Sequence, residues 1–138
     1  MRVATIGLAM LLAGAAGAVG AAAQQPSERP IYGVWLDHHK AVKVETESCG
    51  SSLCGKIVWA TPQAREEAKE AGTDSLIGLE VLSDYHQTSA GTWEGRVFVP
   101  DMKRKFYSRI EQQGPDKLKI SGCILGGLLC KSQYWTRA

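Results

Sequence analysis

Eight short strand-like runs, separated by turn-rich stretches, constrain the fold of this chain more than any other feature. In these runs apolar and polar residues alternate with the period of two that is typical of a half-buried β-strand. The pattern predicts an all-β domain, either an antiparallel barrel or a sandwich. The expected strands cover residues 31–37, 41–48, 54–60, 78–83, 92–99, 104–112, 117–123 and 129–137.

One segment departs from the strand pattern. Thr61 and Pro62 form a good helix start, with a capping hydroxyl followed by proline at the first helical position, and Gly72 is a suitable end. Between them the alanines at positions 64, 68 and 71 share one face. We expect one short helix near residues 62–71 that lies on the surface as a structured connector.

The first 23 residues have the pattern of a secretory signal peptide. Arg2 provides a basic start, residues 3–20 form an uncharged run rich in Ala, Leu and Gly, and three alanines follow. The alternative is an uncleaved membrane anchor, because the run approaches spanning length. We expect cleavage near Ala23, a flexible leader over residues 24–30, a single β-barrel domain over residues 31–138, and a periplasmic or secreted protein.

Four cysteines occur as two close pairs, and each pair encloses a short Gly-containing stretch. An even cysteine count in a small exported chain favours a disulfide framework, although four cysteines allow three connectivities. Our hypothesis is that each pair closes the hairpin that contains it. The expected disulfides are then Cys49-Cys54 and Cys123-Cys130.

These disulfides determine the registers of their hairpins, because side chains alternate between the two faces of a strand. In the first hairpin Val44 falls opposite Trp59, and in the second Leu118 falls opposite Trp135, all on the inner face. The other pairs that follow are Glu47 with Lys56, Thr46 with Ile57, Ile120 with Gln133, Lys119 with Tyr134, and Ser121 with Ser132.

The remaining registers follow from placing large apolar side chains on one face, since each buried one contributes about 1.5–3 kcal/mol. All four tryptophans then point inward, beside Gly33, Gly95 and Gly122. Eight strands fit an up-and-down barrel whose interior is either filled by side chains or able to hold one small ligand. The expected pairs are Trp93 with Ile110, Val97 with Phe106, Glu94 with Arg109, Ile110 with Leu118, Glu111 with Lys117, Trp35 with Val42, and Asp37 with Lys40.

Two motifs at the ends of the domain resemble those of lipocalin-like (calycin) barrels. Gly33-Val34-Trp35 opens the first strand and Trp135-Thr136-Arg137 closes the last. The resemblance implies an eight-stranded antiparallel up-and-down barrel. It also implies structural roles for Gly33, Trp35 and Arg137, with Arg137 lying across Trp35 in a cation–π contact worth about 1 kcal/mol.

A series of spaced motifs covers nearly all of the expected mature chain. They are Tyr32-Gly33-Val34-Trp35, Cys54-Gly55-Lys56-Ile57-Val58-Trp59, Leu76-Ile77-Gly78-Leu79, Gly91-Thr92-Trp93-Glu94-Gly95, Val99-Pro100-Asp101 and Gln133-Tyr134-Trp135-Thr136-Arg137. Together they resemble the bacterial family called domain of unknown function 2147. That family is exported and has no established activity, so the resemblance implies a fold and a compartment.

Asp37, His38 and His39 adjoin at the expected tip of the first hairpin, and a metal or catalytic site is the sharpest interpretation. Neighbouring strand residues point apart, and the third histidine, His86, is expected in a separate loop. Zinc requires about four well-placed ligands, so an exposed turn is favoured. We expect no metal.

Motifs for other chemistry do not occur in the sequence. It has no Gly-x-Ser-x-Gly elbow, phosphate loop or dinucleotide fingerprint, and its thiols are assigned to disulfides. The formal net charge of +2 offers no basic footprint for nucleic acid. We therefore expect no enzyme activity, no cofactor and no nucleic-acid partner.

Two functions stay open at this point, as does the oligomeric state. In the first, the barrel binds a small hydrophobic molecule or lipid between its inward tryptophans. In the second, the indoles fill the barrel, and the protein is a periplasmic interaction module, an envelope-stress factor or enzyme inhibitor, with an envelope protein as its partner. The ligand-binding residues expected for the first are Trp35, Trp59, Trp93, Phe106, Trp135, Leu125 and Leu128.

Residues 124–129, between the second pair of cysteines, are all apolar or glycine, whereas hairpin loops are normally polar. One interpretation is that this loop caps an end of the barrel. The other is an exposed patch for a partner, a lipid surface or a ligand entrance. Leu125 and Leu128 belong to this loop.

Overall fold

A computed structural model describes residues 14, 17, 30–124 and 128–138. Nearly all of the expected signal peptide and leader lie outside the described residues. The described chain contains eight antiparallel strands and one helix. They are β1 (Gly33–Leu36), β2 (Val42–Cys49), β3 (Ser52–Ala60), α1 (Pro62–Glu70), β4 (Glu80–Ser89), β5 (Thr92–Val99), β6 (Arg104–Gln112), β7 (Lys117–Ile124) and β8 (Leu129–Arg137).

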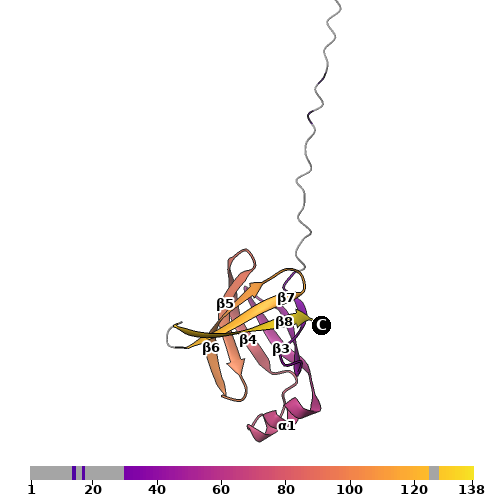
Figure 1. Ribbon diagram of the computed structural model, residues 1–138, viewed down its shortest axis with the longest axis vertical. Coiled ribbons are helices and arrows are strands. Elements are labelled where there is room, and N and C mark those ends of the chain that lie inside the picture. Colours follow the sequence, from indigo (N-terminus) through magenta and orange to yellow (C-terminus); the bar gives the residue numbers. More distant parts are fainter. Residues whose placement is uncertain (1–13, 15–16, 18–29, 125–127) are drawn as a thin grey trace, which may run out of the picture.

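The strands form a closed barrel in up-and-down order (Figure 1). Each strand is hydrogen-bonded to the next one in the sequence, and β8 pairs with β1. The expected eight-stranded antiparallel barrel with one short helix is therefore confirmed. Within the described part of the chain, no helix is both long and apolar enough to cross a bilayer.

Helix α1 follows the signals in the sequence. Thr61 Oγ1 accepts a hydrogen bond from Ala64 N at 3.1 Å, and Pro62 takes the first helical position. Ala68 is buried in the same cluster as Leu76, so the small-residue stripe faces the core. The helix lies at one end of the barrel, in the connection from β3 to β4 (Figure 1).

A short pairing of β1 with β8 closes the barrel. Its register pairs are Trp35 with Arg137 and Leu36 with Thr136. The guanidinium carbon of Arg137 lies 4.2 Å from the centroid of the buried Trp35 ring. The cation–π contact that the family resemblance implies is thus present at this closure.

The Arg137 side chain also binds the backbone of two other segments. Its Nε donates to the Pro115 carbonyl at 2.8 Å, Nη1 to that of Tyr32 at 3.2 Å, and Nη2 to that of Pro30 at 3.0 Å. Gly33 leaves space for it, because a Cβ there would lie 2.7 Å from Nη1. The φ of Gly33, +137°, also favours glycine.

Side chains fill the middle of the barrel. A Cβ at Gly95 would lie 2.6 Å from Tyr85 Cγ, and one at Gly55 would lie 2.9 Å from Leu82 Cδ1. These glycines therefore admit neighbouring side chains and leave no space for a ligand beside them. The largest fully buried hydrophobic side chains are Trp35, Tyr85, Leu53, Ile57, Leu82, Ile110, Leu118 and Val44.

Two hairpins have the registers that the sequence predicts. Trp93 lies opposite Ile110 in β5 and β6, and Leu118 lies opposite Trp135 in β7 and β8. Burial of one face decides these registers, since a slip by one residue would turn the apolar side chains outward.

The register of the first disulfide-bonded hairpin differs from the prediction. Both expected disulfides are present, but Cys49 lies opposite Ser52, and Cys54 lies opposite Glu47. Strand β2 ends at Cys49, whereas β3 already begins at Ser52, two residues before Cys54, so the turn between them is tight and includes Gly50, whose φ is +67°. This bridge therefore joins diagonal positions.

The prediction that Trp59 points into the barrel is wrong. The register shifts so that Lys43 faces Trp59 while Val44 faces Ile57, and Val58 is the extra residue of a β-bulge. The Trp59 side chain is 39% exposed, with Lys43 Nζ 5.0 Å from its ring centroid. The bulge turns this indole to the outer surface, where Lys43 covers it.

Two other predicted pairings are displaced by two residues. A two-residue shift preserves which side chains point inward, so the core is as expected. The observed pairs are Trp35 with Val44, instead of Val42, and Ile110 with Ile120, instead of Leu118.

Strand β4 ends six residues later than the predicted strand over residues 78–83. Asp84 has a φ of +57°, and the register with β5 shifts between Ser83 and His86. The irregularity allows the strand to continue, with Tyr85 fully buried and His86 exposed. His86 therefore lies on a strand and not in a loop.

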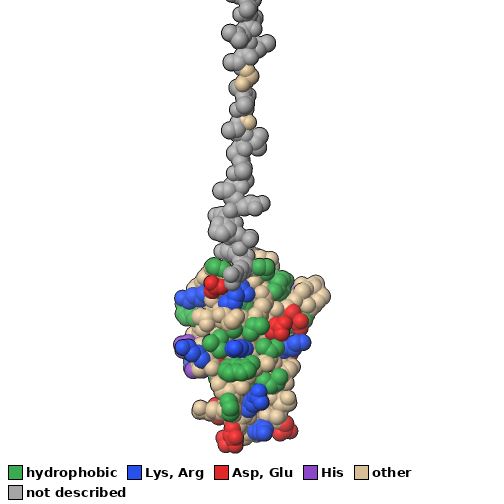
Figure 2. Space-filling model, turned by 90° about the vertical axis from the view of Figure 1, so that its right-hand side faces the viewer, with side chains coloured by type: hydrophobic (Ala, Val, Ile, Leu, Met, Phe, Trp, Pro, Cys, Tyr) green, Lys and Arg blue, Asp and Glu red, His purple; other side chains and the backbone are tan. Residues whose placement is uncertain are grey.

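The outer surface carries side chains of every kind. Figure 2 shows one face of the molecule, on which hydrophobic side chains lie between basic and acidic ones. Charges of both signs on this face agree with the small net charge of +2.

We expect Gly95→Ala to lower the free energy of unfolding by about 1–3 kcal/mol, because the new methyl group would overlap the Tyr85 ring. Gly122→Ala is the matched control, since its Cβ would meet Val97 Cγ1 at an ordinary 3.7 Å. Urea unfolding followed by tryptophan fluorescence measures both variants. Equal losses for the two variants would contradict a filled interior.

We expect Arg137→Lys to lower the free energy of unfolding by about 2–4 kcal/mol, because a lysine cannot reach three carbonyl groups in a fixed fork. Arg65→Lys, at an exposed position of α1, controls for the change of residue type. Thermal and urea unfolding of both proteins measure the difference. No excess loss in Arg137→Lys would show that closure does not depend on the guanidinium.

Candidate functional site

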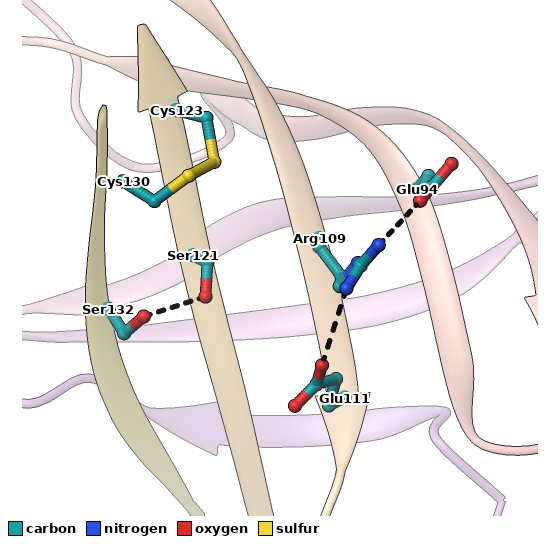
Figure 3. The surroundings of a disulfide bond; sticks show 7 residues. All are labelled: Glu94, Arg109, Glu111, Ser121, Cys123, Cys130 and Ser132. Carbon is teal, nitrogen blue, oxygen red and sulfur yellow. Dashed lines mark hydrogen bonds and ion pairs between the residues drawn. A yellow bond between two sulfur atoms is a disulfide. The ribbon is translucent and has the colours of Figure 1, made fainter. Parts of the chain in front are cut away.

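Two neighbouring contacts join the outer faces of β7 and β8 (Figure 3). Cys123 and Cys130 lie opposite each other and form a disulfide. Two residues along the strands, the hydroxyl oxygens of Ser121 and Ser132 lie 2.7 Å apart. Ile120, the residue before Ser121 in β7, is buried in the core, so the alternating Ser121 and Cys123 lie on the outside of the barrel.

Strand β6 extends this face with a charged cluster. Arg109 lies beside Ser121 in the register of β6 with β7. Its guanidinium group contacts Glu94 Oε1 at 3.2 Å and Glu111 Oε1 at 3.8 Å (Figure 3). Two carboxylates therefore compensate the charge of Arg109.

Tyr107 and Arg109 control the protonation of Glu94. The Tyr107 hydroxyl and then the Arg109 guanidinium hold the pKa of the Glu94 carboxyl below its usual range. Desolvation, followed by the Glu94 carboxylate, raises the pKa of the Tyr107 phenol. At neutral pH Glu94 is charged, and Tyr107 is a neutral hydrogen-bond donor.

An open groove of about 1100 Å³ extends over this outer face, from β5 to β8. This volume is slightly above the range of about 300–1000 Å³ that is usual for small-molecule sites. The disulfide forms part of its lining. The other apolar and aromatic lining residues are Met102, Phe106, Tyr107 and Ile124. The charged lining residues are Arg96, Arg104, Lys105, Arg109, Lys119 and Glu111.

The four tryptophans expected to bind a ligand do not meet in one cavity. Trp35 and Trp135 are buried, and Trp135 Nε1 donates to Gln133 Oε1 at 2.9 Å. Trp93 is half-buried and lines a separate depression of about 310 Å³. Trp59 lies on the outer surface. The indoles are thus divided between the core, a small depression and the exterior.

The other expected ligand-binding residues lie at or near the groove. Phe106 lines it, and Leu128 is 88% exposed, while Leu125 lies outside the described residues. Ile124 and Leu129 are also exposed. The described part of the apolar loop is therefore an exposed patch, and the interpretation of a buried cap is wrong for these residues.

Sequence reasoning missed a pair of buried hydroxyl groups in the interior. Tyr85 and Ser108 are fully buried, and neither hydroxyl has a hydrogen-bond partner among the described residues. Burial raises the pKa of the Tyr85 phenol far above its usual range, and the nearby Ser108 hydroxyl offsets part of that rise. The irregularity at Asp84 interrupts the alternation that would have revealed Tyr85 as an inward residue.

The turn at Asp37, His38 and His39 has a structural explanation. Asp37 Oδ1 accepts hydrogen bonds from the backbone N of Ala41 at 2.7 Å and of Val42 at 2.9 Å, and Oδ2 accepts one from His39 N at 3.0 Å. The two imidazole rings are exposed and lie edge to face, 5.1 Å apart. The Asp37 carboxylate therefore shapes the turn.

A second group of ligand-type residues lies beside the first disulfide. Glu47, Cys49 and Cys54 bring side-chain atoms within 4.8 Å of one another. Both sulfur atoms are oxidised in the disulfide and offer no thiolate to a metal ion.

The closed eight-stranded barrel, with Arg137 across Trp35, has a lipocalin-like fold. Protein HP1028 from Helicobacter pylori, described as belonging to the lipocalin family, has a similar structure, with a TM-score of 0.65 and 16% identity over 80% of this chain and 84% of that chain. The chain belongs to the family described as "Uncharacterized protein conserved in bacteria (DUF2147)", whose model matches residues 33–137. The resemblance inferred from the sequence is thus confirmed. None of the curated proteins matches the chain.

We expect Tyr85→Phe to reduce the loss of stability at alkaline pH. The folded-state pKa of Tyr85 is raised above the unfolded value of about 10, so its contribution is complete below pH 10 and is lost as pH rises through the folded-state pKa. At pH 11 the wild type should lose about 1.4 kcal/mol that the variant retains. Urea unfolding at pH 8 and pH 11 measures this difference, with the exposed Tyr32→Phe as control. Equal losses in all three proteins would contradict the assignment.

Proposed function

We propose that this protein is an exported β-barrel that binds a small hydrophobic molecule or lipid in the groove on the outer face of β5 to β8. The observation that carries the proposal is the groove of about 1100 Å³, with aromatic rings and a disulfide in its lining. The two disulfides fit export to an oxidising compartment.

Exposed apolar surface in the groove provides the driving force for binding. Tyr107, Ile124 and Met102 are 37%, 43% and 57% exposed, and Phe106 is half-buried. Covering such surface contributes about 25 cal/mol for each Å² removed from water. The packing of Tyr85 against Gly95 argues against a ligand in the middle of the barrel.

Covalent and hydrogen-bonded links hold this face in place before a ligand arrives. The Cys123–Cys130 disulfide and the Ser121–Ser132 hydrogen bond join β7 to β8, and Arg109 joins β6 to Glu94 on β5. A surface ordered in advance loses less conformational entropy on binding. These links therefore favour the groove as the binding surface.

We expect the mature protein to bind the fluorescent fatty acid 11-(dansylamino)undecanoic acid, with saturation and a blue shift of the dansyl emission. Ile124→Ala should raise the Kd about five- to tenfold, because it removes an apolar contact worth about 1 kcal/mol. Ile77→Ala is the matched control, since Ile77 is exposed to a similar degree (39% against 43% for Ile124) but does not line the groove. An equal rise in Kd for both variants would show that the ligand does not bind in the groove. Absence of saturable binding would refute the proposal.

A protein-interaction module is the second candidate function. Ile124, Leu128 and Leu129 are 43%, 88% and 55% exposed at the end of the β7–β8 hairpin, and exposed apolar side chains of this size suit a protein interface. A wild-type protein that binds no amphiphile in the same titration would favour this candidate, an envelope protein being the expected partner.

A further inference from the structure

The charges that line the groove are unbalanced. Five of its lining residues are basic, and Glu111 is the acidic one, although the whole chain has a net charge of only +2. A concave surface with one dominant sign of charge raises the local concentration of ligands of the opposite sign. The ligand class that this imbalance favours rests on the proposed function of the groove.

Compensation of the positive charge differs between the two ends of the groove. At one end Arg109 contacts both Glu94 and Glu111, and Lys119 lies opposite Glu111 in the register of β6 with β7. The basic groups at this end already have carboxylates beside them. An anionic ligand would gain little charge interaction here.

The other end, at the start of β6, holds three basic residues without such partners. No ion pair joins Arg96, Arg104 or Lys105 to an acidic group in the described part of the chain. Arg96 faces Tyr107, and Lys105 stands two residues from Tyr107 on the same face, a diagonal that long side chains can span. Asp101, in the adjoining turn, does not line the groove.

Apolar surface adjoins this basic end. The guanidinium carbon of Arg104 lies 5.5 Å from the centroid of the Phe106 ring. Tyr107 lies beside Cys123 in the register of β6 with β7, and Ile124 follows Cys123 at the end of β7. A charged head at Arg96 and Lys105 would thus place an attached apolar chain against the tyrosine ring and the disulfide.

We infer that the groove binds an anionic amphiphile, a molecule with one carboxylate or phosphate head and an apolar chain. Its head lies beside Arg96 and Lys105, and its chain covers Tyr107 and the disulfide. Guanidinium groups bind carboxylate and phosphate in bidentate fashion. Either anion could therefore pair with the guanidinium group of Arg96.

Displacement of the dansyl fatty acid by four ligands tests the inference. The ligands are dodecanoate, dodecyl phosphate, neutral dodecanol and inorganic phosphate, each below its aggregation concentration, with the mature, disulfide-bonded protein. We expect at least tenfold tighter binding of an anionic amphiphile than of dodecanol, and no displacement by phosphate alone. Raising the salt from 50 to 500 mM should weaken binding of the anions and leave that of dodecanol unchanged. The relative affinities of the two anions identify a carboxylate or a phosphate head.

A charge variant locates the head. Arg96→Gln combined with Lys105→Gln should weaken binding of the anions about tenfold and leave dodecanol binding unchanged. The control, Lys40→Gln combined with Lys43→Gln, removes the same charge from residues that do not line the groove and should leave all affinities unchanged.

Each contrary outcome has a separate meaning. If dodecanol binds as tightly as the anions, or if both charge variants act alike, the inference fails and the proposed function stands. If inorganic phosphate displaces the probe, the site recognises an anion and not an amphiphile, and the inference fails. If neither the dansyl probe nor any amphiphile binds, the proposed function fails as well.

Discussion

Closure of the barrel depends on the interaction of one arginine with three separate segments. β1 has four residues and shares two register pairs with β8, so its backbone alone supplies few hydrogen bonds to the joint. Arg137 adds a ring contact to Trp35 and hydrogen bonds to carbonyl groups that precede β1 and β7. Without this side chain, β1 and β8 would behave as sheet edges with unpaired backbone groups. A closed sheet is in turn the condition for a continuous buried interior.

The interior of the barrel is filled by side chains, so the large groove lies on the outer face. Eight-stranded barrels are narrow enough for a few large side chains to occupy the lumen. Here the Tyr85 ring covers Gly95 and Leu82 fills the space at Gly55, so glycines at these positions serve close packing. The Tyr85 and Ser108 hydroxyls are buried in this interior, where removing a polar group from water costs free energy. The groove over β5 to β8 lies outside the barrel and does not require this packing to open.

Period-two alternation made most of the fold predictable from the sequence. Registers and side-chain directions were not predictable where a local irregularity interrupts a strand. The β5–β6 and β7–β8 registers were predictable because their buried apolar pairs all lie on one face. In β7–β8 a directly opposed cysteine pair requires the same register. The prediction for Trp59 was wrong because the bulge at Val58 exchanges the inward and outward positions of the residues that follow it. No glycine or proline at this position marks the bulge in the sequence. The outward pairs Glu94 with Arg109 and Ser121 with Ser132 were predictable, yet the groove they border was not. Its lining comes from four strands and the adjoining turns, which no single register pair reports.

The groove and the closure are connected through one strand. Along β8, Cys130 and Ser132 face the groove, Trp135 enters the core, and Arg137 closes the barrel. Because side chains alternate along a strand, a slip of β8 by one residue would remove the groove lining, the core indole and the closing guanidinium from their faces together. The Cys123–Cys130 disulfide opposes such a slip at the start of β8, and Arg137 opposes it at the end. The two contacts therefore maintain the same register, and the shape of the outer groove depends on a contact made at the opposite end of the strand.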